Sequence, residues 1–111
     1  RMDTQTETPA AAVTEPDAAS VVGLHCVVRT YSAGVHLGEV LRREGTQVVL
    51  KDARRLWKWN GAFTLSEVAV KGISKSGSRL AVAVPLMELT EAIEIIPTSP
   101  EARATFEAVH E

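Results

Sequence analysis

Runs of branched apolar residues, separated by short turn signals, constrain the fold of this chain most strongly. VVGLHCVVRT (residues 21–30) is dense in Val, VHLGEVLRRE (35–44) alternates imperfectly, and TQVVLK (46–51) follows the dipeptide Glu44–Gly45. Such runs are typical of β-strands, and the Glu-Gly turn joins the second and third of them into a predicted hairpin. The first half of the chain is therefore expected to be a sheet.

The next segment, ARRLWKWN, has the alternation of a further strand and holds both tryptophans of the chain. Alternate residues of a strand share a face: Arg55, Trp57 and Trp59 on one, and Arg54, Leu56 and Lys58 on the other. RLAVAVP (79–85) is a predicted strand stopped by Pro85, and the Ile-rich segment 88–97 is another.

Two helices are predicted from their start signals. Thr64 and Glu67 have the spacing of a capping box, which begins a helix over residues 65–71 that a glycine follows. Ser99–Pro100 places a capping hydroxyl before a proline at the first helical position, so a second helix is expected over residues 100–109. Short connections favour hairpins over crossovers. The expected fold class is α+β: a small antiparallel β-sheet of about five to six strands with two short helices, in an oligomer.

Charge and composition divide the chain into parts. Residues 1–20 contain no aromatic side chain and are expected to be disordered, which leaves residues 21–111 as one β-rich domain. The formal charge is −3 for residues 1–20, +6 for residues 21–87 and −5 for residues 88–111. A basic middle attracts anions such as phosphates, whereas the acidic end argues against a broad surface for long nucleic acid.

Cysteine content and hydropathy point to a cytoplasmic location. The single Cys26 excludes a disulfide framework within the chain. No segment approaches the roughly 20 apolar residues needed to span a bilayer, and no signal peptide is recognisable. We expect a soluble protein of a reducing cytoplasm that has no membrane partner.

Signatures of catalysis are missing from the sequence. The three histidines, His25, His36 and His110, are too scattered for a metal motif, and one cysteine cannot form a thiolate cluster. There is no Walker-type loop, and neither Ser32 nor Ser66 stands in a recognisable nucleophile motif. We expect no enzyme, no metal and no cofactor.

Two clusters carry the positive signal. Arg54 and Arg55 beside the tryptophans offer a planar fork of phosphate donors next to indole faces that stack on bases. The alternative is that the tryptophans fill the core, or that one packs inside while the other meets a ligand. In Arg29-TYSAG, the small residues Ser32, Ala33 and Gly34 suit a nest of backbone amides for an anion. A bulge between two strands is the alternative there.

The sequence resembles a family of small phage proteins over about residues 25–103. The shared patterns are VRTYSAGV, ARR-x-W-x-W-x-GA, LSE-x-A and TEAIEIIP, in that order along the chain. The chain is thereby identified as similar to the first described Thoeris anti-defence family, the phage cyclic-nucleotide sponges. It departs from the family pattern in its long acidic N-terminal segment and at Thr98, where relatives often have Cys.

The resemblance implies that residues 21–111 form a nucleotide-binding domain. Members of that family act in the cytoplasm of the host bacterium, where they bind and sequester, without degrading it, the glyco-cyclic ADP-ribose isomer made by TIR proteins. They form homodimers or hexamers, and a separate pocket type holds cyclic di- or trinucleotides. The implied ligand-binding residues are Arg29, Ser32, Ala33, Gly34, Arg54, Arg55, Trp57 and Trp59. Two alternatives remain: a small structural or interaction module of a phage or prophage, with the Trp pair in its core or oligomer interface, and an enzyme that degrades cyclic nucleotides.

Overall fold

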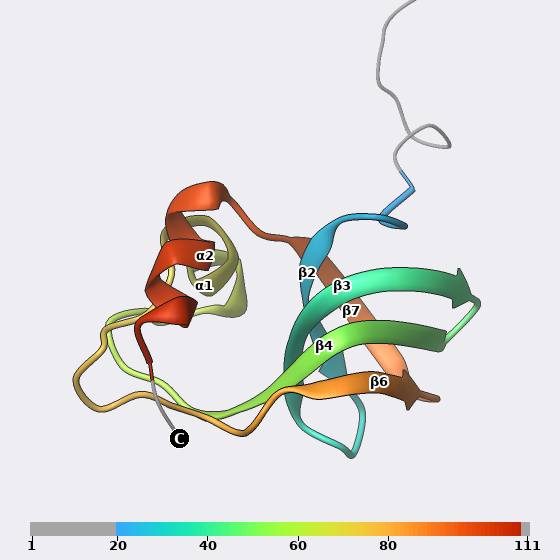
Figure 1. The fold of residues 1–111 in the computed structure, drawn as a ribbon, viewed down its shortest axis with the longest axis horizontal. Coiled ribbons are helices and arrows are strands. Elements are labelled where there is room, and N and C mark those ends of the chain that lie inside the picture. Colours follow the sequence, from blue (N-terminus) through green and yellow to red (C-terminus); the bar gives the residue numbers. More distant parts are fainter. Residues whose placement is uncertain (1–19, 110–111) are drawn as a thin grey trace, which may run out of the picture.

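An antiparallel sheet of six strands dominates the computed structural model, which describes residues 20–109 (Figure 1). The strands are β2 (His25–Thr30), β3 (Val35–Glu44), β4 (Gln47–Lys58), β5 (Arg79–Leu80), β6 (Val84–Leu89) and β7 (Ala92–Pro97). Their order is β5-β4-β3-β2-β7, and β6 pairs with the same edge of β4 as β5 does. Together with two helices in the described range, this confirms the predicted α+β class. The segment 1–20, expected to be disordered, lies outside the described residues except for Ser20, and so does His110.

The sheet is curled, because its two outer strands follow each other in the chain. β6 pairs with β4 and β7 pairs with β2 at the other edge, yet only residues 90 and 91 separate them. So short a link spans only about 10 Å, so the edges must approach each other (Figure 1). The concave side is filled by one apolar cluster: Cys26, Val28, Val40, Val48, Leu50, Ala53, Leu89 and Ala92.

Two short helices cover the other face of the sheet. They are α1 (Leu65–Lys71) and α2 (Pro100–Glu107), which lie side by side (Figure 1). Neither helix of the described range is long and apolar enough to cross a membrane. The second core cluster lies between the helices and the sheet: Val27, Leu37, Leu56, Val68, Ala69, Ile73, Leu80, Ala102, Phe106 and Val109. Neighbouring residues of β2 thus enter different clusters, as the alternation of a strand requires.

The helix starts follow the predicted caps. Thr64 Oγ1 accepts a hydrogen bond from Glu67 N at 3.1 Å, and α1 has the predicted bounds. The Glu67 carboxylate accepts from Phe63 N at 2.8 Å, one residue before the position that an ideal capping box would use. Ser99 Oγ accepts from Ala102 N at 3.0 Å and donates to Val70 O at 2.6 Å. The second cap therefore also fastens the start of α2 to α1.

The segments predicted as two strands, TQVVLK and ARRLWKWN, form the single strand β4. The interruption that the sequence indicates is a β-bulge. Glu39 pairs with Lys51 and Leu37 with Arg54, so β4 carries one more residue than β3 between these pairs. Asp52 has φ 53°, in the left-handed region that Asp tolerates better than most residues. The bulge bends the strand without ending it.

Other predicted boundaries are also corrected. Pro85 does not stop a strand over 79–85: β5 ends at Leu80, and Pro85 is the second residue of β6. Proline is tolerated there because β6 has a neighbour on one side only. The predicted strand 88–97 is divided by the link between β6 and β7. The predicted hairpin of β3 and β4 is confirmed, while the first strand and the last helix are shorter than expected.

Candidate functional site

An open cleft of about 360 Å³ lies where the end of β2 meets the loop that leads into α1. Its walls come from β2, β3, β7 and residues 59–66, so the fold assembles it from four separate segments. The lining residues are Arg29, Val35, Trp59, Phe63, Thr64, Leu65, Ser66 and Glu94. Arg29 and Trp59, predicted from two different motifs of the sequence, therefore meet in one cleft.

Arg29 supplies the positive charge of this cleft. It lies opposite Glu94 in the β2–β7 ladder, and its Nη1 is 3.8 Å from Glu94 Oε1. The two side chains are 55% and 44% exposed. Ion pairs as exposed as this contribute about 0–1 kcal/mol. Glu94 therefore holds the guanidinium beside the cleft but leaves it able to exchange its partner for a ligand phosphate.

Two aromatic side chains supply flat faces. Trp59 follows the end of β4, is half-buried and packs against the helix-side core cluster, so its ring is a fixed wall. Phe63 is 95% exposed although it precedes a helix cap. A residue at that position often packs against the fourth helical residue as a hydrophobic staple. Val68 is the fourth helical residue here. It is fully buried although Phe63 is exposed, so Phe63 does not act as a staple.

Phe63 was not among the residues predicted from the sequence. An aromatic residue before a capping box is typical of a hydrophobic staple, which packs against the helix. The sequence therefore indicates a structural role for Phe63 and not a ligand contact. Only its exposure in the structure indicates a free aromatic face. Ser66 adds an exposed hydroxyl to the same wall.

The predicted amide nest at TYSAG does not line this cleft. Gly34 has φ 86°, as a tight turn requires, but the polar groups of the turn bond to one another. Ala33 N donates to Thr30 Oγ1 at 2.8 Å, and Thr30 Oγ1 donates to Gly34 O at 2.8 Å. Ser32 Oγ donates to the Glu91 carboxylate. The structure therefore leaves Ser32, Ala33 and Gly34 as an ordered turn beside the site.

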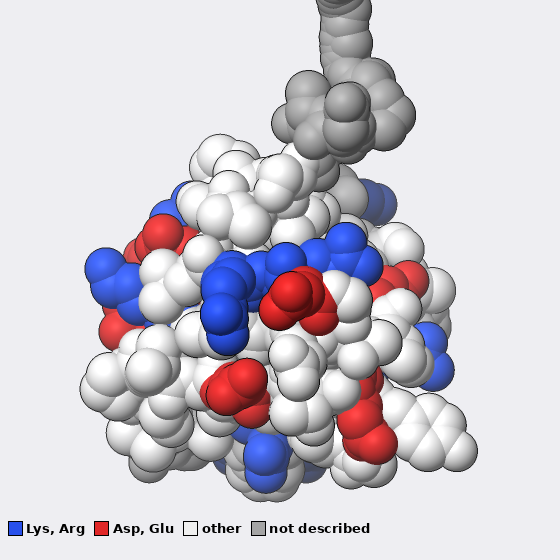
Figure 2. All heavy atoms as spheres, turned by 90° about the vertical axis from the view of Figure 1, so that its right-hand side faces the viewer, with Lys and Arg blue, Asp and Glu red and all other residues white. Residues whose placement is uncertain are grey.

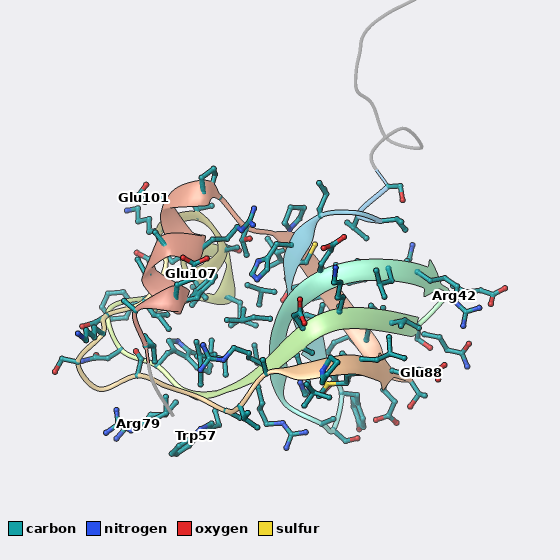
Figure 3. All side chains as sticks on the ribbon, viewed as in Figure 1. Arg42, Trp57, Arg79, Glu88, Glu101 and Glu107 are labelled. Atoms are coloured by element: carbon teal, nitrogen blue, oxygen red, sulfur yellow. The ribbon has the colours of Figure 1, made fainter. Side chains whose placement is uncertain are left out.

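The remaining predicted residues are dispersed. Arg55 and Trp57 are both exposed on β4, but Trp59 does not join them. The register shifts after Leu56 and the strand ends at Lys58, so Trp59 turns to the helix side. Trp57 is 58% exposed, and it projects from the same side of the molecule as Arg79 (Figure 3).

Arg54 lies apart from the cleft. Its Nε donates to Ala81 O at 2.8 Å and its Nη2 to Leu80 O at 3.3 Å. This guanidinium thus connects β4 to the last residue of β5 and to the residue after it, and it lines a second cavity near α2. Cations and carboxylates are intermingled on the face shown in Figure 2, so the basic middle of the sequence does not form one continuous field there.

A family model described as a domain of unknown function, DUF6948, matches residues 23–106. The chain belongs to this family. The matched range begins just before β2 and ends within α2, so it includes the whole sheet and every residue that lines the cleft. No curated protein and no solved structure matches the chain.

Buried titratable groups of this DUF6948 domain lie outside the cleft. His36 is fully buried, its Nε2 lies 3.0 Å from Ala33 O, and its Nδ1 has no partner among the described residues. Burial lowers the pKa of His36 below its usual value. Burial also raises the pKa of the Cys26 thiol to about 11, so Cys26 is a thiol at neutral pH. In residues 20–109 no group of three or more His, Cys, Asp or Glu side chains is placed to hold a metal ion.

Proposed function

We propose that this protein binds and sequesters a cyclic nucleotide immune signal without degrading it, as a phage anti-defence protein in the cytoplasm of the host bacterium. One observation carries the proposal: Arg29, Trp59 and Phe63 line the same cleft. A nucleotide presents a charged phosphate and a flat base, and these three side chains offer a partner for each. The sequence resemblance to the Thoeris anti-defence sponges supports the same ligand class.

The energies favour this ligand class. A guanidinium can donate two parallel hydrogen bonds to phosphate oxygens, and a charged hydrogen bond contributes about 1.5–3 kcal/mol. Stacking on an aromatic ring contributes about 1–3 kcal/mol per base. The volume of about 360 Å³ is at the small end of ligand sites, which range from roughly 300 to 1,000 Å³. The proposed ligands are glyco-cyclic ADP-ribose isomers made by TIR proteins and, in a separate pocket type, cyclic di- or trinucleotides.

A homo-oligomer belongs to the proposal. Phe63 is 95% exposed on an open cleft. A sponge must bury most of its ligand to hold it tightly, and a second copy of the chain, in a homodimer or hexamer, supplies the missing wall.

Trp57 favours the alternative function. It is 58% exposed, outside the cleft, and on the same side of the molecule as Arg79 (Figure 3). Exposed tryptophan and arginine are enriched in protein interfaces, as expected for a structural or interaction module of a phage or prophage. The half-buried Trp59 then serves only the core.

Arg29→Ala separates the two functions. In a thermal-shift titration with cyclic ADP-ribose isomers and cyclic di- and trinucleotides, a sponge loses about tenfold or more in affinity on this change. Its melting temperature without ligand stays close to that of the unchanged protein, because Arg29 makes only one exposed ion pair. Arg42→Ala, at the far end of β3, is the matched control (Figure 3). Equal affinities of both variants would contradict the proposal.

Glu94→Gln provides a test in the opposite direction. Glu94 competes with a ligand phosphate for Arg29. Its neutralisation should therefore raise the affinity, and the rise should shrink with added salt because it is electrostatic. A lower affinity would show that Glu94 itself binds the ligand or that Arg29 does not.

A further inference from the structure

The β-bulge in β4 creates a second concave surface, on the helix side of the sheet. Asp52, with φ 53°, is the extra residue. Gly38 lies opposite, where a Cβ atom would be 3.1 Å from Lys51 O and 3.3 Å from Ala53 Cα. The close approach of Gly38 fixes the bulge. Bulges often redirect side chains next to functional sites.

Two adjoining cavities, of about 120 and 200 Å³, lie between the bulge, the start of β2 and α2. They share His25, Asp52 and Arg103. Neither has a lining residue in common with the Arg29 cleft. We call this surface the bulge cleft.

Three cationic side chains from two elements line the bulge cleft: Lys51 and Arg54 of β4 and Arg103 of α2. Arg54 is held in place by the carbonyl oxygens of Leu80 and Ala81, and its Nη1 has no bond to the described part of the chain. Across residues 20–109, no ion pair within 4.0 Å engages any of these three cations. They are therefore available to an anionic group.

Carboxylates line the same cleft. Asp52 lines both cavities, Glu39 lines one of them and Glu107 the other. Three carboxylates would repel a simple polyanion, and the described residues give no cluster fit for a metal ion. A carboxylate among cations accepts hydrogen bonds from hydroxyl groups. The mixture suits a ligand that has a phosphate at one end and hydroxyl groups at the other.

We propose that the bulge cleft binds a small phosphorylated polyol, such as a sugar phosphate. Arg54, Arg103 and Lys51 receive the phosphate, and Asp52 accepts hydrogen bonds from vicinal hydroxyl groups. The site is independent of the proposed function, because it uses none of the residues of the Arg29 cleft.

The test is a titration of the full chain with D-ribose 5-phosphate, followed by amide chemical shifts in ¹⁵N-labelled protein. Inorganic phosphate and free ribose are the component probes. We expect saturable shifts at residues 51–54 and 103–107, and affinity about tenfold or more above that of inorganic phosphate. Asp52→Asn keeps a residue that tolerates the left-handed region, but it leaves one neutral acceptor oxygen in place of two charged ones, so it should reduce this advantage over phosphate. No shifts, or an advantage that Asp52→Asn leaves unchanged, would overturn the proposal.

The cationic side is tested separately. Arg103→Gln and Lys51→Gln should each weaken ribose 5-phosphate and inorganic phosphate alike, by about tenfold. Arg42→Gln should change neither affinity. Arg29→Ala should also leave both unchanged, so that failure of the Arg29 cleft and failure of the bulge cleft give different results. Binding that Arg29→Ala abolishes would contradict the assignment.

Discussion

Gly72→Ala should be the most damaging small substitution in this fold. Gly72 ends α1 with φ 90° and ψ −160°, a region open almost only to glycine. A Cβ atom there would lie 2.1 Å from Thr105 Oγ1 and 2.8 Å from Thr105 Cγ2. Thr105 cannot easily move away, because its Oγ1 accepts from Ile73 N at 3.1 Å and donates to Ala102 O at 2.6 Å.

The magnitude follows from two terms. The backbone conformation costs a non-glycine residue about 1–3 kcal/mol, and overpacking costs about 1–3 kcal/mol. We therefore expect the free energy of unfolding to fall by about 2–6 kcal/mol, a large fraction of the roughly 5–15 kcal/mol typical of a small domain. Urea unfolding followed by far-UV circular dichroism measures it.

Gly45→Ala is the matched control, because Gly45 also has a positive φ, 61°, but nothing lies within 4 Å of its Cβ position. Gly45→Ala should lower the free energy of unfolding by only about 1–2 kcal/mol. Thr105→Ala combined with Gly72→Ala should cost less than the two changes added together, since the clash is shared. Equal losses for Gly72→Ala and Gly45→Ala would refute the argument from the Thr105 contact.

Three further predictions concern the caps and the buried titratable groups. Ser99→Ala should lower the free energy of unfolding by about 1–2 kcal/mol, measured in urea, because the cap of α2 loses its acceptor. Burial lowers the folded-state pKa of both His25 and His36. The unfolded chain therefore binds more protons below pH ~6.5, and stability should fall as the pH drops from 6.5 towards the folded-state values; urea midpoints at pH 8 and pH 5 check this. Cys26, buried and with a pKa near 11, should react with a thiol reagent at neutral pH only as fast as the protein opens, and far faster in urea.

Local signals with a single physical meaning predicted the structure well. The capping residues Thr64 and Glu67 predicted the start of α1 correctly, because the free backbone amides at a helix start need hydrogen-bond acceptors and these two side chains supply them. The turn predicted at Glu44–Gly45 joins β3 to β4 one residue later, at Gly45 and Thr46, because Glu44 still pairs with Gln47. In both places the neighbours in the chain determine the geometry.

Features that depend on distant partners could not be predicted. The bulge at Asp52 arises from the register with β3, and nothing in the sequence of β4 marks one residue as extra. Pro85 sits inside β6 only because that strand is at an edge. Neither condition is local.

In the candidate site, too, the residue types could be predicted from the sequence, but their meeting in space could not. Arg29 and Trp59 were predicted from their chemistry. They meet in one cleft because the core cluster between the helices and the sheet brings β2 and the loop before α1 together, and the sequence does not show this packing. Phe63 was missed because its neighbours suggest a packing role. Trp57 was expected beside Trp59, and the shifted register after Leu56 separates them.

Calorimetric titration of the purified protein with a glyco-cyclic ADP-ribose isomer, followed by heating and chromatography of the released ligand, tests the central claim most directly. Sequestration predicts saturable, tight binding and recovery of the ligand unchanged. At a thousandfold excess over the dissociation constant it also predicts about 4 kcal/mol of added stability. Absence of heat with this ligand and with cyclic di- and trinucleotides, or recovery of a cleaved product, would contradict the account.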